Sequence, residues 1–86
     1  MKEFKYIIQD QEGIHARPAG LVVAEAKKYP NTVITITNKG KTADLKRIFG
    51  VMGLGVKKGE EVVIAFDGAE EEAAYAGVSK VFKDNL

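Results

Sequence analysis

The most constraining feature of this sequence is the alternation of strand-like and helix-like segments within only 86 residues. Residues 32–37 read TVITIT, a run of β-branched side chains that is typical of a strand. A hydrophobic period of two predicts further strands at residues 4–8 and 62–66. After a turn at residues 38–41, a shorter strand around Thr42 and Ala43 would complete a hairpin. We therefore expect four short strands.

Three other segments favour helices. In the segment that begins at Ala16, apolar residues at i, i+3, i+4 and i+7 form a stripe of Ala19, Val22, Val23 and Ala26. This stripe predicts an amphipathic helix of about three turns that ends near Tyr29 and Pro30. Residues 45–55, LKRIFGVMGLG, predict a brief helix interrupted by glycines. The acidic residues 70–72 open a last helix. Its inward stripe is expected to comprise Ala74, Val78, Val81 and Phe82.

The resulting order, β-α-β-β-α-β-α, has too few helices to cover both faces of a sheet. We therefore expect an α+β fold, with a four-stranded antiparallel sheet and three helices packed on one face, which is an open-faced β-sandwich. Residues 1–86 are expected to form a single domain, because two domains of half this length would each bury too little apolar surface.

The composition excludes several classes of function. With 45% hydrophobic and 29% charged residues, the chain has the composition of an ordinary globular protein. Its 13 basic and 12 acidic side chains nearly cancel, which argues against nucleic acid or a membrane surface as a partner. One histidine and no cysteine leave only carboxylates, which show no loop pattern of a calcium or magnesium site, so we expect no metal site and no cofactor. No apolar run is long enough for a leader or a membrane span, so a cytoplasmic protein is expected.

The only histidine lies in the segment EGIHARPAG, residues 12–20. His15 immediately precedes the predicted helix, so the unpaired amides of Ala16 and Arg17 and the positive end of the helix dipole form a potential anion site. The same dipole disfavours a protonated imidazole and is expected to keep His15 neutral and nucleophilic. Once the ring holds a phosphoryl group, the amides and the Arg17 guanidinium could bind its oxygens.

Taken singly, these residues have ordinary explanations. A lone histidine in a small domain is most often a solvated surface residue, and an exposed arginine is most often a solubilising charge. Their combination at one helix N-terminus favours a functional site. Gly13 is expected to permit a close approach, and Gly20 to leave a shallow surface one turn along, where a partner could dock.

Two motifs, GIHARPA at residues 13–19 and LKRIFGVMGLGV at residues 45–56, resemble the two signatures of the HPr family, the histidine-containing phosphocarriers of the bacterial sugar phosphotransferase system. The resemblance covers essentially the whole chain. It implies that His15 accepts a phosphoryl group on Nδ1 from phosphorylated enzyme I and donates it to enzyme IIA domains of sugar permeases. Arg17 and the amides of Ala16 and Arg17 would hold the phosphate. Such a protein is a group carrier, expected as a monomer, rather than an enzyme.

The second motif implies a docking surface by the same resemblance. Ile48, Phe49 and Met52 fall on one face of the short helix and could form an apolar patch beside His15. Periodicity alone favours a core role for them, although Leu45, Val51 and Leu54 can serve the core instead. The expected docking residues are Gly20, Lys27, Arg47, Ile48, Phe49 and Met52.

The sequence departs from the family at Arg47. Many Gram-positive relatives have at this position a serine that a dedicated kinase phosphorylates, so this protein is expected to lack that control. Arg47 could instead favour acidic partners, or be an ordinary exposed arginine. The alternative functions are a regulatory module that docks on transcription factors or metabolic enzymes, and a carrier dedicated to a nitrogen-linked or dihydroxyacetone branch. A nucleic-acid-binding domain is disfavoured by the charge balance.

Overall fold

The computed structural model describes residues 1–86 and contains the predicted elements in the predicted order. Along the chain these are β1 (Lys2–Ile7), α1 (Ala16–Ala26), β2 (Thr32–Asn38), β3 (Lys41–Asp44), α2 (Ile48–Gly53), β4 (Glu61–Gly68) and α3 (Glu71–Asn85). None of the three helices combines the length and the hydropathy needed to cross a membrane.

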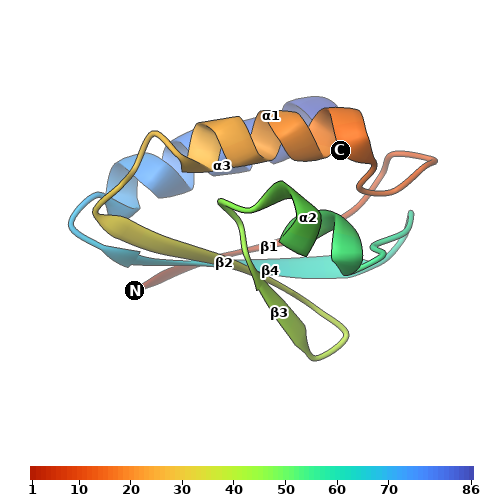
Figure 1. Ribbon diagram of the computed structural model, residues 1–86, viewed down its shortest axis with the longest axis horizontal. Helices are drawn as coiled ribbons and strands as arrows, with labels where there is room; N and C mark the ends of the chain where they lie inside the picture. The colour runs from red at the N-terminus through yellow and green to blue at the C-terminus, as the bar shows by residue number, and fades with distance from the viewer.

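The four strands form one antiparallel sheet in the order β1-β4-β2-β3. The last strand of the sequence, β4, is therefore central and pairs with both β1 and β2, so that Ile64 lies opposite Phe4 on one side and Ile36 on the other. All three helices lie on one side of the sheet, as Figure 1 shows. The predicted α+β class and open-faced architecture are confirmed.

The hydrophobic core fills the space between the helices and the covered face of the sheet. Alternate strand residues such as Phe4, Ile34 and Phe66 point into it, and α1 contributes the predicted stripe. Helix α3 buries Ala74, Val78 and Phe82 as expected, but Val81 is only half-buried and Ser79 is buried in addition. Ser79 can be buried because its hydroxyl donates to the carbonyl oxygen of Ala76.

The hairpin between β2 and β3 has a loop of two residues. Lys39 and Gly40 both have positive φ angles, +52° and +80°, which is the arrangement that suits the right-handed twist of the flanking strands. Lys39 also forms an ion pair with Glu60 at 2.6 Å. The hairpin places the short edge strand β3 next to the segment that leads into α2.

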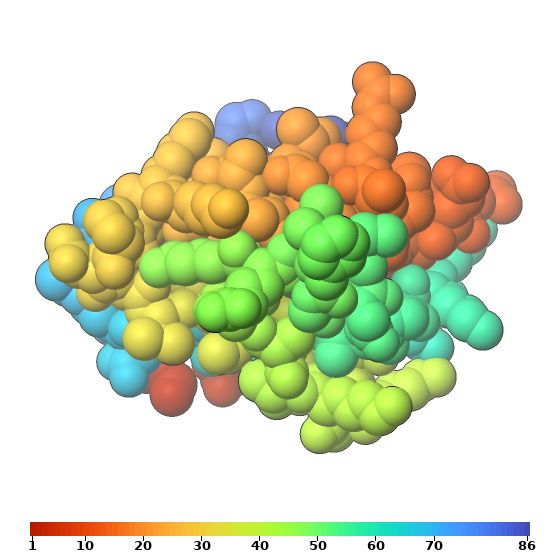
Figure 2. Space-filling view, in the orientation of Figure 1, coloured from red at the N-terminus to blue at the C-terminus, as the bar shows by residue number.

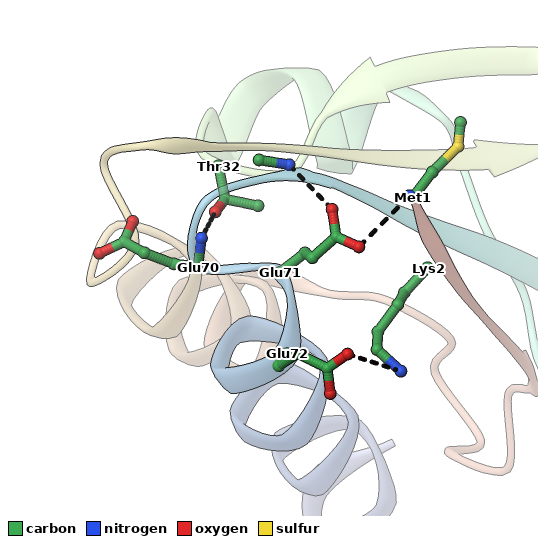
Figure 3. A network of polar contacts seen from close by, with 7 residues as sticks. Met1, Lys2, Thr32, Glu70, Glu71 and Glu72 are labelled. Carbon is green, nitrogen blue, oxygen red and sulfur yellow. Dashed lines mark hydrogen bonds and ion pairs between the residues drawn. The ribbon is translucent and has the colours of Figure 1, made fainter.

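Two hydrogen bonds join the beginning of β2 to the beginning of α3. The amide of Glu70 donates to Thr32 Oγ1 at 2.9 Å, and the carboxylate of Glu70 accepts from the amide of Asn31 at 2.8 Å. The first of these bonds is visible in Figure 3. Thr32 is 2% exposed, and this bond satisfies its hydroxyl inside the protein.

The first turn of α3 is also connected to the first residues of β1. The carboxylate of Glu71 accepts from the amide of Gly68 at 3.2 Å and lies 3.3 Å from the amino group of Met1. Glu72 pairs with Lys2 at 3.3 Å in the same region of Figure 3. These donors lower the pKa of Glu71, chiefly through the Gly68 amide and secondly through the amino group.

Candidate functional site

His15 is the residue that directly precedes the first helical residue of α1, as predicted. Its backbone is extended, with φ −100° and ψ −179°, and its carbonyl oxygen accepts the first helical hydrogen bond, from the amide of Ala19. The imidazole forms no capping hydrogen bond. The amides of Ala16 and Arg17 therefore have no acceptor in the protein. Pro18 has no backbone N–H and so needs no acceptor. Two amides are available at the positive end of α1.

The loop before His15 is held by backbone contacts. The amide of Gly13 donates to the carbonyl oxygen of Asp10 at 3.0 Å, and the amide of Ile14 donates to that of Val56 at 3.1 Å. Gly13 has a φ of +69°, and a Cβ at this position would overlap the carbonyl oxygen of Val56. The expected close approach at Gly13 is thus made by the protein's own backbone rather than by a partner.

Two carboxylates lie beside the imidazole, a feature that the sequence analysis missed. His15 Nε2 is 3.6 Å from Asp10 Oδ2 and 3.7 Å from Glu12 Oε2. The side chain of His15 is 35% exposed, that of Asp10 28% and that of Glu12 74%. Their negative charges attract positive charge on the ring, whereas the N-terminus of α1 repels it. The prediction of a ring held neutral considered only the helix.

The three side chains also form a group of potential metal ligands. One donor atom from each of Asp10, Glu12 and His15 lies within 4.8 Å of the others. The expectation of no metal site rested on the lack of a calcium or magnesium loop pattern among the carboxylates, which does not show that two of them lie beside the histidine. Arg17 and the positive end of α1 lie next to the group, and their charges oppose the binding of a cation there.

A shallow hollow of about 320 Å³ lies in front of His15 and is open to solvent. It is lined by Asp10, His15, Arg17, Pro18, Leu21 and Asn85. Arg17 is exposed and has no carboxylate partner among the ion pairs of the protein. Its guanidinium group is thus available to an anion that enters the hollow.

Besides Asp10, the residues Leu21 and Asn85 of this lining were not predicted. Leu21 lies one turn beyond Arg17 on α1 and is 47% exposed, a position that helical periodicity could have identified. Asn85 belongs to α3, 70 residues after His15, and no local pattern connects the two. Its amide nitrogen donates to the carbonyl oxygen of Val81, which fixes the side chain at the edge of the hollow.

Helix α2 packs beside α1 and exposes apolar side chains. Phe49 is 86% exposed and Met52 is 36% exposed, so the interpretation of these two residues as core is wrong. Ile48 is half-buried, and its Cδ1 lies about 4 Å from the position that a Cβ on Gly20 would occupy. A Cβ on Gly20 would thus make ordinary van der Waals contact with α2, which shows that the two helices are in contact here. In Figure 2 the green segment that contains α2 adjoins the orange segment of α1 on one continuous face.

Arg47 and Lys27, the two basic residues expected in the docking surface, lie on different helices of the protein or next to them. Arg47 directly precedes α2, is 81% exposed, and has its Nε atom 3.9 Å from Asp44 Oδ2. Lys27 follows the last residue of α1 and is exposed, about 18 Å along the helix from His15. It lies two turns beyond Gly20 on the same stripe of α1. Arg47 thus lies on the face formed by α2. Lys27 lies at the edge of this surface that is distant from His15.

Comparison with known proteins gives one consistent result. Residues 2–84 match the family model described as the PTS HPr component phosphorylation site. The phosphocarrier protein HPr of Mycoplasma genitalium is 35% identical over 85 residues, which are 99% of this chain and 97% of that protein. Two solved structures agree closely with the fold. The histidine-containing phosphocarrier protein of a mycoplasma has a TM-score of 0.93 at 36% identity, covering 96% of this chain and 93% of its own. HPr from Thermoanaerobacter tengcongensis has a TM-score of 0.91 at 34% identity, covering 98% and 93%.

Proposed function

The chain belongs to the HPr family of the phosphotransferase system, and we propose that His15 carries a phosphoryl group from phosphorylated enzyme I to enzyme IIA domains of sugar permeases. The observation that supports this most directly is the position of His15 next to two amides without an acceptor, those of Ala16 and Arg17. The half-exposed His15 and the unpaired guanidinium group of Arg17 line one open hollow, and the two free amides lie at the same helix N-terminus.

The proposed transfer has two balanced steps. The lone pair of His15 Nδ1 attacks phosphorus, a nitrogen–phosphorus bond forms, and the donor leaves with the electron pair of the bond that breaks. The amides of Ala16 and Arg17 and the Arg17 side chain donate hydrogen bonds to the phosphoryl oxygens. A nucleophile of the enzyme IIA domain then attacks the same phosphorus, and His15 leaves with the electron pair of the nitrogen–phosphorus bond. The protein is thus a substrate that its partners phosphorylate and dephosphorylate, which makes it a group carrier rather than an enzyme.

The surface formed by Gly20, Lys27, Arg47, Ile48, Phe49 and Met52 is the proposed docking surface for both partners. Exposed Phe49 and Met52 offer adaptable apolar contact area, and Arg47 adds a positive charge that favours acidic partners. Because an arginine occupies the position of the regulatory serine, we propose that docking at this surface is not controlled by phosphorylation there. We further propose that the protein acts as a cytoplasmic monomer.

The test is incubation with enzyme I and phosphoenolpyruvate. We expect an acid-labile, base-stable phosphate on the wild-type protein and none on His15→Ala, with circular dichroism showing that the variant is folded. A phosphate that persists in His15→Ala contradicts the assignment. The alternative of a regulatory docking module is separated by complementation, because a carrier restores sugar uptake to a strain that lacks its own HPr and a folded regulatory module does not.

A further inference from the structure

Both carboxylates beside the imidazole approach the same nitrogen atom. Asp10 Oδ2 and Glu12 Oε2 lie 3.6 Å and 3.7 Å from His15 Nε2, and neither pairs with Nδ1. These separations exceed those of direct hydrogen bonds, so the contacts are between negative charges and the edge of the ring. The three electron-rich atoms lie within 4.8 Å of one another.

This arrangement discriminates between the two neutral forms of imidazole. An ionised carboxylate can only accept a hydrogen bond, and a neutral imidazole has one protonated nitrogen and one with a lone pair. A lone pair on Nε2 would face two negative charges and be repelled by both. A proton on Nε2 would be attracted by both charges and would leave the lone pair on Nδ1.

The local backbone holds Asp10 in this position. Its Oδ1 atom accepts a 2.8 Å hydrogen bond from the amide of Glu12, and its carbonyl oxygen accepts from the amide of Gly13. Its own amide donates to the carbonyl oxygen of Leu86 at 2.9 Å, which connects the loop to the end of α3. Asp10 therefore presents Oδ2 to the ring from a fixed backbone, whereas Glu12 reaches it with a longer, mostly exposed side chain.

We infer that Asp10 and Glu12 are positioning residues that keep the proton of the neutral His15 ring on Nε2 and so direct Nδ1 toward incoming phosphorus. The other groups near the ring do not favour the opposite form. None of them carries a negative charge: the end of α1 and Arg17 are positive, and Asn85 from α3 is a neutral amide bonded to Val81.

The consequence for phosphoryl transfer rests on the proposed function. When Nδ1 forms its bond to phosphorus and the donor leaves with its electron pair, the ring acquires positive charge while Nε2 keeps its proton. The two carboxylates then face that charge, as the aspartate of a serine-protease triad faces its histidine. The choice of nitrogen is thus made by this chain before any partner binds.

The experiment is ¹⁵N NMR of the imidazole, and the presence of a single histidine makes its two nitrogen signals unambiguous. Spectra are recorded at about pH 9, where imidazole is neutral. We expect the Nε2-protonated form to dominate in the wild-type protein. Asp10→Asn and Glu12→Gln should each lower the ratio of the Nε2-protonated to the Nδ1-protonated form, by about two- to fivefold, the effect typical of partly exposed charge contacts. Asp10→Asn should have the larger effect, because Asp10 is the less exposed.

Both variants preserve the fold of the loop, since asparagine keeps an oxygen that can accept from the amide of Glu12. The matched control is Asp67→Asn. This variant removes an equal charge at the end of β4 that is distant from the His15 loop, and it should leave the ratio unchanged. An unchanged ratio in both loop variants, or an equal change in the control, overturns the inference. The measurement needs no enzyme I, so it is independent of the phosphorylation test: failure of phosphorylation with a normal shift in the ratio refutes the carrier function alone.

Discussion

The ammonium group of Lys46 donates a 2.6 Å hydrogen bond to the carbonyl oxygen of Thr32 and so connects the segment before α2 to the beginning of β2. The same group donates at 2.7 Å to the carbonyl oxygen of Tyr29. One side chain thus satisfies two carbonyl oxygens of the connection between α1 and β2. It also fixes where α2, with its exposed Phe49, begins relative to α1.

Replacement of Lys46 by methionine should therefore destabilise the protein. The stem of the side chain can still pack, but two carbonyl oxygens lose a charged donor, which costs about 1–3 kcal/mol of unfolding free energy. Urea denaturation measures the change. Lys58→Met is the matched control, because Lys58 is exposed and has no partner in the structure, and its unfolding free energy should be close to that of the wild type. Equal effects of the two substitutions would refute the role of Lys46.

A second prediction concerns Gly13 and separates backbone strain from steric overlap. Gly13→Ala and Gly40→Ala both place an alanine at positive φ, which costs about 1–2 kcal/mol. At Gly40 the new Cβ meets open space, whereas at Gly13 it overlaps the backbone of Val56. Gly13→Ala should thus lower the unfolding free energy by roughly 3 kcal/mol or more. Thermal and urea unfolding of the two variants measure the difference. A smaller loss of unfolding free energy in Gly13→Ala than in Gly40→Ala contradicts the prediction.

The lowered pKa of Glu71 predicts a dependence of stability on pH. A carboxyl group whose pKa is lower in the folded than in the unfolded state stabilises the fold above its ordinary pKa of 4.5, and this contribution is lost as the pH falls through the folded value. Glu71→Gln should thus be less stable than the wild type at pH 7, and the difference should shrink as the pH falls below 4.5 and through the lowered pKa of the folded state. Urea denaturation at several pH values tests this. Glu3→Gln, on the exposed face of β1, is the control for the loss of one negative charge. If the difference in unfolding free energy between Glu71→Gln and the wild type does not change with pH, the Glu71 carboxylate is not the cause of the pH dependence.

The exposure of Phe49 predicts that it contributes to binding rather than to stability. Phe49→Ala should weaken association with enzyme I by about tenfold, as for an aromatic contact residue, and leave the melting temperature nearly unchanged. Isothermal titration calorimetry and thermal unfolding measure the two quantities. Val33→Ala is the control, because Val33 is 66% exposed but lies on the uncovered face of the sheet. A large loss of thermal stability in Phe49→Ala would show that the side chain serves the fold instead.

Local periodicity predicted much of this molecule. The type and order of every element followed from it, because β-branched alternation in TVITIT and the apolar stripe of α1 are properties of neighbouring residues. The position of His15 directly before α1 followed for the same reason, since Pro18 suits the first turn of a helix. The strand order did not follow, because the pairing of β4 between β1 and β2 depends on contacts between distant residues.

The surroundings of His15 were less predictable than its position. Asp10 and Glu12 are close in sequence, but the loop that turns both carboxylates toward Nε2 is set by contacts with Val56 and Leu86. No periodicity describes such a loop. The close approach expected at Gly13 could not be assigned to a particular segment for the same reason, since the backbone next to it comes from 43 residues further along the chain.

The central place of β4 in the sheet determines when the loop around His15 takes its final conformation during synthesis of the protein. β1 pairs only with β4, more than 50 residues later, and the loop that presents His15 is held by Val56 and Leu86. Contacts between such distant segments close late and slow the folding of small domains. A nascent chain on the ribosome can display the GIHARPA motif long before these contacts exist. The loop around His15 thus forms only after the segments through Leu86 have been synthesised, and shorter translation products contain the histidine without the contacts that position it.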